Sequence, residues 1–120
     1  MSLPLAPEHL VAAYEFLRVL PPMSGWKLPH ADEIVFAVNK HASCLGTYQA
    51  GPGKRREIAC SMKNIGHTDT LLRVMAHEQV HLYQELRGTE GRGNVQHNAE
   101  FRRLSARICK YNGWDPRLFV

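Results

Sequence analysis

Apolar residues recur at helical spacing in three stretches, which are predicted to be helices: 7–20, 71–87 and 97–111. Pro7 suits the first turn of the first helix, and Pro21 cannot continue it. Thr68-Asp69-Thr70 supplies N-cap candidates for the second helix, and Gly88 is a typical C-terminal stop. The pattern therefore predicts one helix near the N-terminus and two in the second half of the chain.

Shorter β-branched and aromatic runs lie between the first two helices and are predicted to be strands: 33–38, 43–49 and 56–62. The last two flank AGPGKR, which is rich in turn-forming residues and predicts a hairpin. A turn centred near Pro52 would place Cys44 opposite Cys60. The order of helix, strand, hairpin, helix and helix indicates an α+β fold with a small antiparallel sheet.

Composition narrows the class of protein. The 120 residues, 44% hydrophobic and 22% charged, suit one soluble domain, 1–120, and argue against disorder. We expect no membrane span, since no apolar run approaches the roughly 20 residues needed, and no secretory signal. Three cysteines without a CxxC pair favour a reducing cytoplasm. The net charge of +4 permits an anionic partner without requiring one, and the oligomeric state stays open.

The second predicted helix carries the strongest chemical signal, the HExxH motif His77-Glu78-Gln79-Val80-His81. Residues four apart share a helix face, so both imidazoles can reach one metal ion. Glu78 lies about 100° around the helix, where it can act as a general base without ligating the metal. Apolar residues occupy the opposite arc and are predicted to pack in the core: Leu71, Met75, Leu82 and Leu86.

A catalytic zinc site usually has three protein ligands and one open position, so a third ligand is expected. The candidates along the chain are His97, Glu100, Glu90 and His67. His97 opens the last helix after a loop that allows the helix to fold back, and Glu100 follows one turn later. Composition and spacing do not choose between His97 and Glu100.

A family resemblance bears on that choice. HEQVHLYQ followed by QHNAEF resembles the SprT-like metalloproteases, whose pattern is HExxH, a loop, and a third His in an H-G-x-E-F segment. Upstream, LGTY and EIACS resemble the hairpin of that family, so the likeness runs from about Cys44 to Phe101. It implies a minimal zincin-like core, with the antiparallel sheet packed on the HExxH helix and the third ligand on the C-terminal helix.

By resemblance, His77, His81 and His97 hold one zinc ion per chain, and Glu78 is the general base of a zinc metalloendopeptidase. The zinc-activated water attacks a peptide bond of a protein or peptide substrate, and Phe101 serves as a packing residue. The family glycine is replaced by Asn98, which tolerates the αL conformation next best. The chain ends at Val120 without the four-cysteine zinc ribbon of many bacterial members.

Further site residues are expected around this centre. Zincin substrates usually add as a strand to a sheet edge, and the 56–62 strand is the predicted edge, through Arg56, Ile58 and Cys60. Candidates for a second oxyanion donor are Tyr48, His67 and Tyr111. DNA is a candidate partner through the basic residues of the last helix, Arg102, Arg103 and Arg107.

Two alternatives remain open on the sequence. In one, the zinc only holds two helices together, and the chain is a non-catalytic DNA-binding or adaptor domain. In the other, the chain is a zincin of a different family that uses Glu100 as the third ligand.

Overall fold

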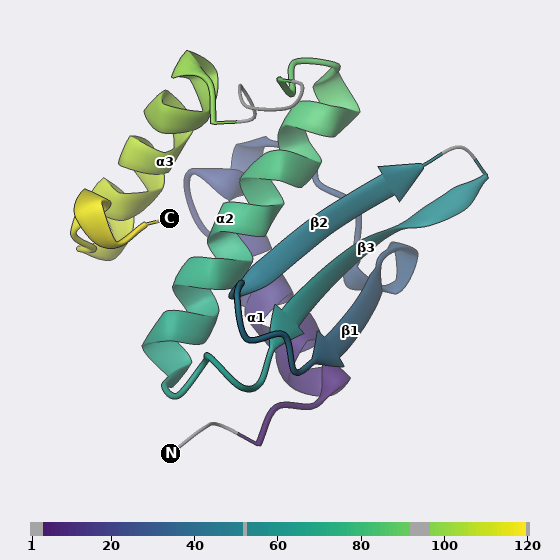
Figure 1. Cartoon of the computed structure of the whole chain (residues 1–120). Coiled ribbons are helices and arrows are strands. Elements are labelled where there is room, and N and C mark those ends of the chain that lie inside the picture. Colours follow the sequence, from purple (N-terminus) through teal and green to yellow (C-terminus); the bar gives the residue numbers. More distant parts are fainter. Residues whose placement is uncertain (1–3, 52, 92–96, 120) are drawn as a thin grey trace.

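The computed structural model describes residues 4–51, 53–91 and 97–119, which form three α-helices and a three-stranded sheet (Figure 1). The helices and strands are α1 (Pro7–Arg18), β1 (Val35–Asn39), β2 (Gly46–Gly51), β3 (Lys54–Ser61), α2 (Thr68–Arg87) and α3 (Ala99–Asn112). The α+β class predicted from the order of apolar patterns is confirmed. None of the described helices is both long and apolar enough to span a membrane.

Helix α1 packs against both the sheet and α2 through the side predicted from its apolar spacing. Its buried residues are Leu10, Ala13, Tyr14 and Leu17. Tyr14 also contacts Phe36 in β1, with the two rings in a T-shaped arrangement and 5.4 Å between their centroids. The helix thus fixes the position of α2 relative to the sheet.

The sheet is mixed, so the prediction of an antiparallel sheet is wrong for one of its two strand pairs. Strand β3 is central; β2 pairs with it antiparallel as the predicted hairpin, while β1 pairs with it parallel on the other side. The connection 40–45 crosses the end of β3, which lets β1 and β3 run in the same direction. Asn64 holds this crossing by donating hydrogen bonds to the carbonyl oxygens of His41 and Cys44.

The hairpin register differs from the predicted one by two residues. Gly46, and not Cys44, is the Cα partner of Cys60. Pro52, at the centre of the predicted turn, lies outside the described residues. Cys60 and Cys109 are buried, Cys44 is half-buried, and all three thiols are free.

Helix α2 is the central element of the domain and lies between the sheet and α3 (Figure 1). It is buried on nearly every side between Val74 and Leu82, because α1, β2, β3 and α3 all contact it. Gly88 ends it in the αL conformation, with φ 72°, which agrees with the predicted stop. Leu86, near that end, is 40% exposed, so its predicted place in the core is wrong.

Helix α3 begins at the N-cap residue Asn98. Asn98 is extended, with φ −74° and ψ −175°, and is not in the αL conformation expected for the residue that replaces the family glycine. Its side chain accepts a hydrogen bond from the backbone N–H of Phe101 at 2.9 Å. Asn is a strong N-cap residue, so the local sequence already contained this signal.

Candidate metal centre

His77 and His81 project from the same face of α2, one turn apart. Their Nε2 atoms lie 3.2 Å from each other, and both side chains are almost fully buried. Two nitrogens that each lie 2.0–2.1 Å from a tetrahedral zinc are about 3.4 Å apart. The helix therefore already holds the two imidazoles at close to the separation of ligands on one ion.

His97 completes the group from the segment just before α3. One ligand atom from each of His77, His81 and His97 lies within 4.8 Å of the others. The His97 ring stacks on Phe101, with 4.4 Å between ring centroids, and Phe101 is buried against all three imidazoles. Because His97 is itself exposed, the centre is open to solvent on this side.

The surroundings keep the two helix histidines uncharged. Burial, with the neighbouring imidazoles, lowers the pKa of His77 to about 3, and burial together with His97 lowers that of His81 to about 4. Neutral imidazole is the form that offers a lone pair to a metal. The donor set of three imidazoles therefore fits zinc, a common partner of nitrogen ligands in proteins.

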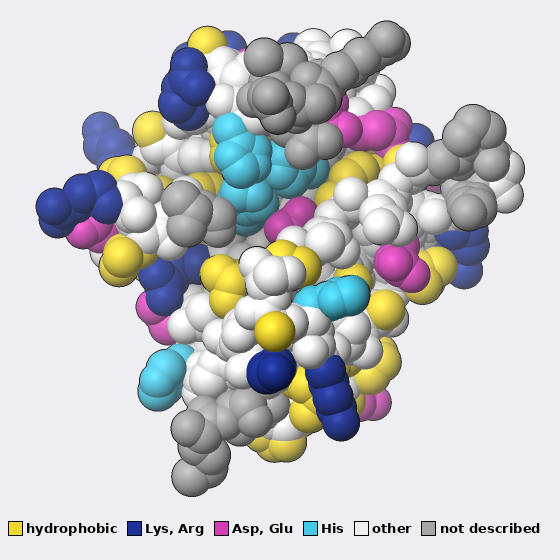
Figure 2. Space-filling model, viewed as in Figure 1, with side chains coloured by type: hydrophobic (Ala, Val, Ile, Leu, Met, Phe, Trp, Pro, Cys, Tyr) yellow, Lys and Arg dark blue, Asp and Glu magenta, His cyan; other side chains and the backbone are white. Residues whose placement is uncertain are grey.

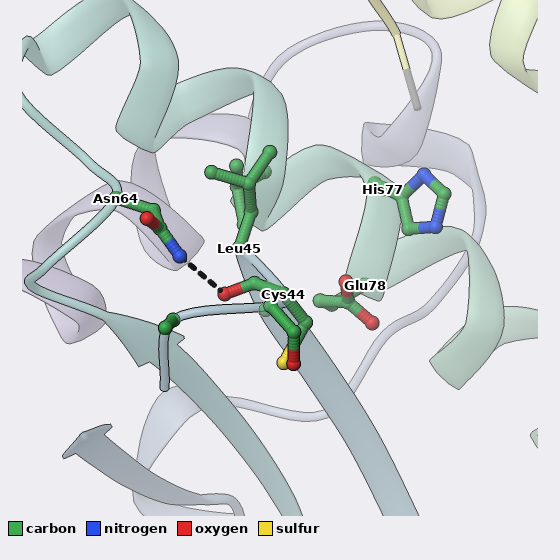
Figure 3. Close-up of a pocket in the computed structure, with 9 residues that line it drawn as sticks. Cys44, Leu45, Asn64, His77 and Glu78 are labelled. Carbon is green, nitrogen blue, oxygen red and sulfur yellow. Dashed lines mark hydrogen bonds between the residues drawn. The ribbon is translucent and has the colours of Figure 1, made fainter. Parts of the chain in front are cut away.

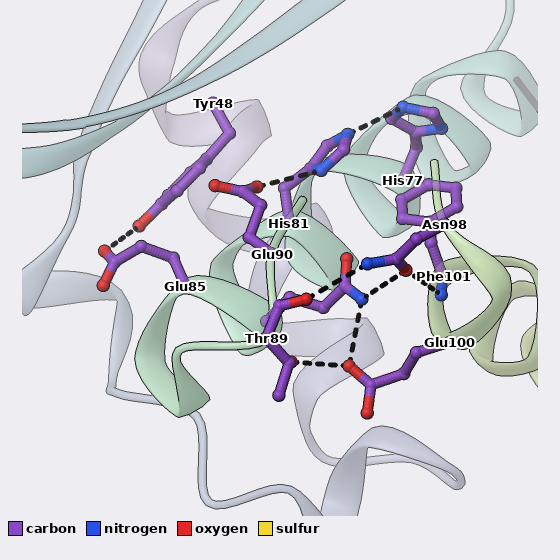
Figure 4. A network of polar contacts seen from close by, with 10 residues as sticks. Tyr48, His77, His81, Glu85, Thr89, Glu90, Asn98, Glu100 and Phe101 are labelled. Atoms are coloured by element: carbon purple, nitrogen blue, oxygen red, sulfur yellow. Dashed lines mark hydrogen bonds and ion pairs between the residues drawn. The ribbon is translucent and has the colours of Figure 1, made fainter. Parts of the chain in front are cut away.

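Glu90, a candidate third ligand by sequence, lies behind His81. Its Oε2 atom is 3.1 Å from Nδ1 of His81, on the opposite side of the ring from Nε2 (Figure 4). When Nε2 offers its lone pair to a metal, the single ring proton lies on Nδ1, which donates to Glu90. A carboxylate in this position fixes the tautomer and the orientation of a metal-binding histidine. Only the tertiary structure shows this contact between Glu90 and His81.

Glu78 is buried beside His77 at the junction of two cavities. One, of about 550 Å³, lies between α2 and the connection 40–45, where Cys44, Leu45 and Asn64 line it (Figure 3). The other, of about 310 Å³, is lined by all three histidines of the centre. Figure 2 shows histidine side chains gathered in a hollow at the middle of this face, with an acidic side chain beside them. Burial and the nearby Glu90 carboxylate raise the pKa of Glu78 to about 8.

Gly46 in β2 lets the strand approach α2 at this point. A Cβ atom on residue 46 would lie 2.7 Å from Cγ1 of Val74, 3.1 Å from the backbone oxygen of Ala59 and 3.3 Å from Oε2 of Glu78. The first of these distances is too short for any side chain to be accommodated without movement. The close contact between β2 and the Glu78 carboxylate therefore depends on glycine.

We expect Gly46→Ala to lower the free energy of unfolding by about 1–3 kcal/mol, as overpacking of a core does. Urea unfolding followed by circular dichroism measures this loss. Gly25→Ala is the matched control, because a Cβ atom there meets nothing within 4 Å. Equal stability of the two variants would show that β2 can move away from α2 without cost.

The Glu100 side chain makes its polar contacts away from the three histidines. Its Oε1 accepts a hydrogen bond from Thr89 (Figure 4) and another from Gln84. Its Oε2 lies 3.3 Å from a guanidinium nitrogen of Arg87. These contacts join the end of α2 to the start of α3 and lower the pKa of the carboxyl group. The structure thus brings His97, and not Glu100, to the two helix histidines.

The predicted substrate strand is not an edge. Strand β3 is paired on both sides, and Ile58 and Cys60 are fully buried, so it cannot accept a further strand. Arg56 forms an ion pair with Glu85 of α2 at 2.8 Å. The prediction of substrate binding through Arg56, Ile58 and Cys60 is therefore wrong for β-strand addition. The edge beside the centre is β2, whose residues 46–48 line the cavity of the three histidines.

The remaining sequence candidates are those for a second oxyanion donor and for DNA contacts. Tyr48 lines the histidine cavity, but its hydroxyl group donates a hydrogen bond to Glu85 at 2.8 Å. His67 precedes α2 as its N-cap residue, and Tyr111 is exposed near the end of α3. Three arginines proposed to contact DNA are exposed on α3: Arg102, Arg103 and Arg107.

Comparison of the sequence with models of protein families gives no match, and comparison with curated proteins gives none either. The geometry of the site itself therefore carries the functional argument.

Proposed function

We propose that this protein is a zinc-dependent metallopeptidase of the SprT-like type. The observation that carries the proposal is the convergence of His77, His81 and His97, with the Glu78 carboxylate in the same cavity. Three imidazoles leave one coordination position for a reacting group, as catalytic zinc sites do. A helix that carries both ligands and an acidic side chain next to the first of them meets the geometric needs of metal-assisted hydrolysis.

A zinc ion bound by the three imidazoles supplies a Lewis acid that polarises a carbonyl group and acidifies water. Glu78 receives the proton of the attacking water and later delivers it to the leaving amine. Its carboxylate suits both transfers, because it lines the histidine cavity and the larger cavity next to it. The charge of a metal ion held by the three imidazoles would favour the ionised form of the Glu78 carboxyl group, would offset the effect of burial on its pKa, and would let Glu78 act as a base.

Strand β2 is the proposed docking edge for the substrate. It is an edge of the sheet in the described part of the chain, and Gly46, Thr47 and Tyr48 line the histidine cavity. An extended peptide that pairs with β2 would gain main-chain hydrogen bonds and place one peptide bond beside Glu78. This mode requires an unfolded segment of substrate, so flexible proteins, including DNA-associated ones, are the expected substrate class.

Metal removal tests the proposal. We expect one zinc ion per chain by elemental analysis, and cleavage of casein, an unfolded protein, that stops after chelation and returns with added zinc. Bound zinc should also raise the unfolding temperature, because it binds the folded state. Metal-free protein that cleaves casein at the same rate as zinc-loaded protein would refute the proposal.

A further inference from the structure

A separate cavity of about 370 Å³ lies between α3 and the segment that follows it. Six residues form most of its wall: Phe101, Ser105, Ala106 and Cys109 from α3, and Pro116 and Phe119 from the C-terminal segment. This segment folds back toward α2 (Figure 1), where Phe119 lies 5.8 Å from the ring of His77 between centroids. The C-terminal residues thus build a second wall beside the metal centre.

The cavity adjoins the centre through a shared residue. His97 lines it and also lines the central cavity, where His77, His81 and Glu78 meet. An extended peptide advances about 3.3 Å per residue. A peptide bond held at the three imidazoles therefore brings an adjacent side chain of the same peptide to the mouth of this cavity.

The walls favour an apolar occupant. Phe101, Phe119 and Cys109 are buried, and burial raises the pKa of the Cys109 thiol, which therefore stays uncharged. The Ser105 hydroxyl group donates to the backbone oxygen of Phe101 at 2.7 Å, so its proton is already used. Arg102, the one charged residue of the wall, donates to the backbone oxygen of His97 at 2.8 Å. A charged substrate side chain would lose its hydration here, and in this wall only the exposed Arg102 could pair with an acidic one.

The geometry points to a specificity pocket that takes a large apolar side chain, such as Leu or Phe, from the substrate residue next to the scissile bond. The inference rests on the proposed peptidase function and adds the class of substrate to it. A pocket of this kind discriminates by the apolar surface that the side chain buries, which supports about a tenfold to hundredfold preference over a small residue.

Hydrolysis of a peptide series tests the pocket. Each peptide carries Leu, Phe, Ala or Asp at one varied position. In one set this position directly precedes the scissile bond, and in a second set it directly follows the bond. We expect kcat/KM to be at least about tenfold higher for Leu or Phe than for Ala or Asp, on one side of the bond only. Ala106→Leu, which fills the cavity from an exposed helix position, should remove the preference without loss of zinc. Ala12→Leu, the same change at an exposed position of α1, should leave it intact.

A binding measurement separates this inference from the proposed function. Zinc-loaded Glu78→Gln protein should bind the Leu peptide more tightly than the Ala peptide in fluorescence anisotropy, and adding Ala106→Leu should equalise them. This binding result would support the pocket even if the wild-type protein cleaved no peptide. A lack of cleavage would overturn only the peptidase function. Equal affinities for all peptides, or a preference that Ala106→Leu leaves unchanged, would overturn the pocket.

Discussion

Glu78→Gln is expected to lower kcat for peptide hydrolysis by about 10²–10⁴-fold, the usual contribution of a general base. The amide keeps the size of the side chain but cannot receive a proton from water. Zinc content should stay at one ion per chain, since the three imidazoles are untouched. The measurement pairs the rate of casein or peptide cleavage with elemental analysis of the same preparation.

Glu85→Gln is the control for this variant. Glu85 lies two turns further along α2, where it accepts hydrogen bonds from Tyr48 and Arg56 and does not line the histidine cavity. Its replacement should reduce stability through the lost ion pair and leave most of the hydrolysis in place. If Glu78→Gln cleaves as fast as wild type, Glu78 is not the base, and another group must receive the proton of the attacking water. If neither protein cleaves while both bind zinc, a zinc site that serves only to hold helices together becomes the better account.

Local signals explain why the helices were predictable. Pro7 and Gly88 mark helix ends through their own backbone preferences, which act within one turn of chain. The apolar spacing of α1 identified the face that the structure buries. Leu86 differs from this pattern because it lines a surface cavity beside Leu28 and Arg56 and is 40% exposed. Periodicity does not show where the packed core ends.

The sheet could be predicted only in part, because strand order is not a local property. The turn-rich segment between β2 and β3 dictates an antiparallel hairpin. Nothing in the residues of β1 shows which edge of the hairpin it joins, and joining at β3 makes it parallel. The same choice turned β3 into the central strand and moved the open edge to β2. The error in the substrate strand therefore follows directly from the error in sheet order.

The residues of the site also fall into those set by local helix geometry and those set by the tertiary fold. His77, Glu78 and His81 are fixed by helix geometry, so their spacing alone placed them on neighbouring faces of α2. Glu90 against His81, and the cavity behind His97, depend on how the chain returns after α2. On the sequence, His97 was separable from Glu100 only through the family resemblance. The structure brings His97 to the two helix histidines and holds Glu100 elsewhere. Gln84 and Thr89 already engage the Glu100 carboxylate.

His97→Ala and Glu100→Ala are therefore expected to have opposite effects in two measurements. His97→Ala should weaken zinc binding by at least about 100-fold, beyond the 10–100-fold typical of losing an outer partner of a ligand. Glu100→Ala should bind zinc almost as tightly as wild type. In the absence of metal, Glu100→Ala should be the less stable of the two variants. Glu100 joins α2 to α3 through Gln84, Thr89 and Arg87, whereas His97 is exposed.

Competition with a chelating dye measures the zinc affinity of each variant, and urea unfolding of the metal-free proteins measures stability. Glu100→Ala should lose about 1–3 kcal/mol of unfolding free energy, because the buried amide group of Gln84 loses its hydrogen bond to Glu100. The crossed design separates ligand loss from misfolding, because a misfolded variant fails in both measurements. Retained affinity in His97→Ala together with weak binding in Glu100→Ala would make Glu100 the third ligand and place the chain among zincins with a His-His-Glu site.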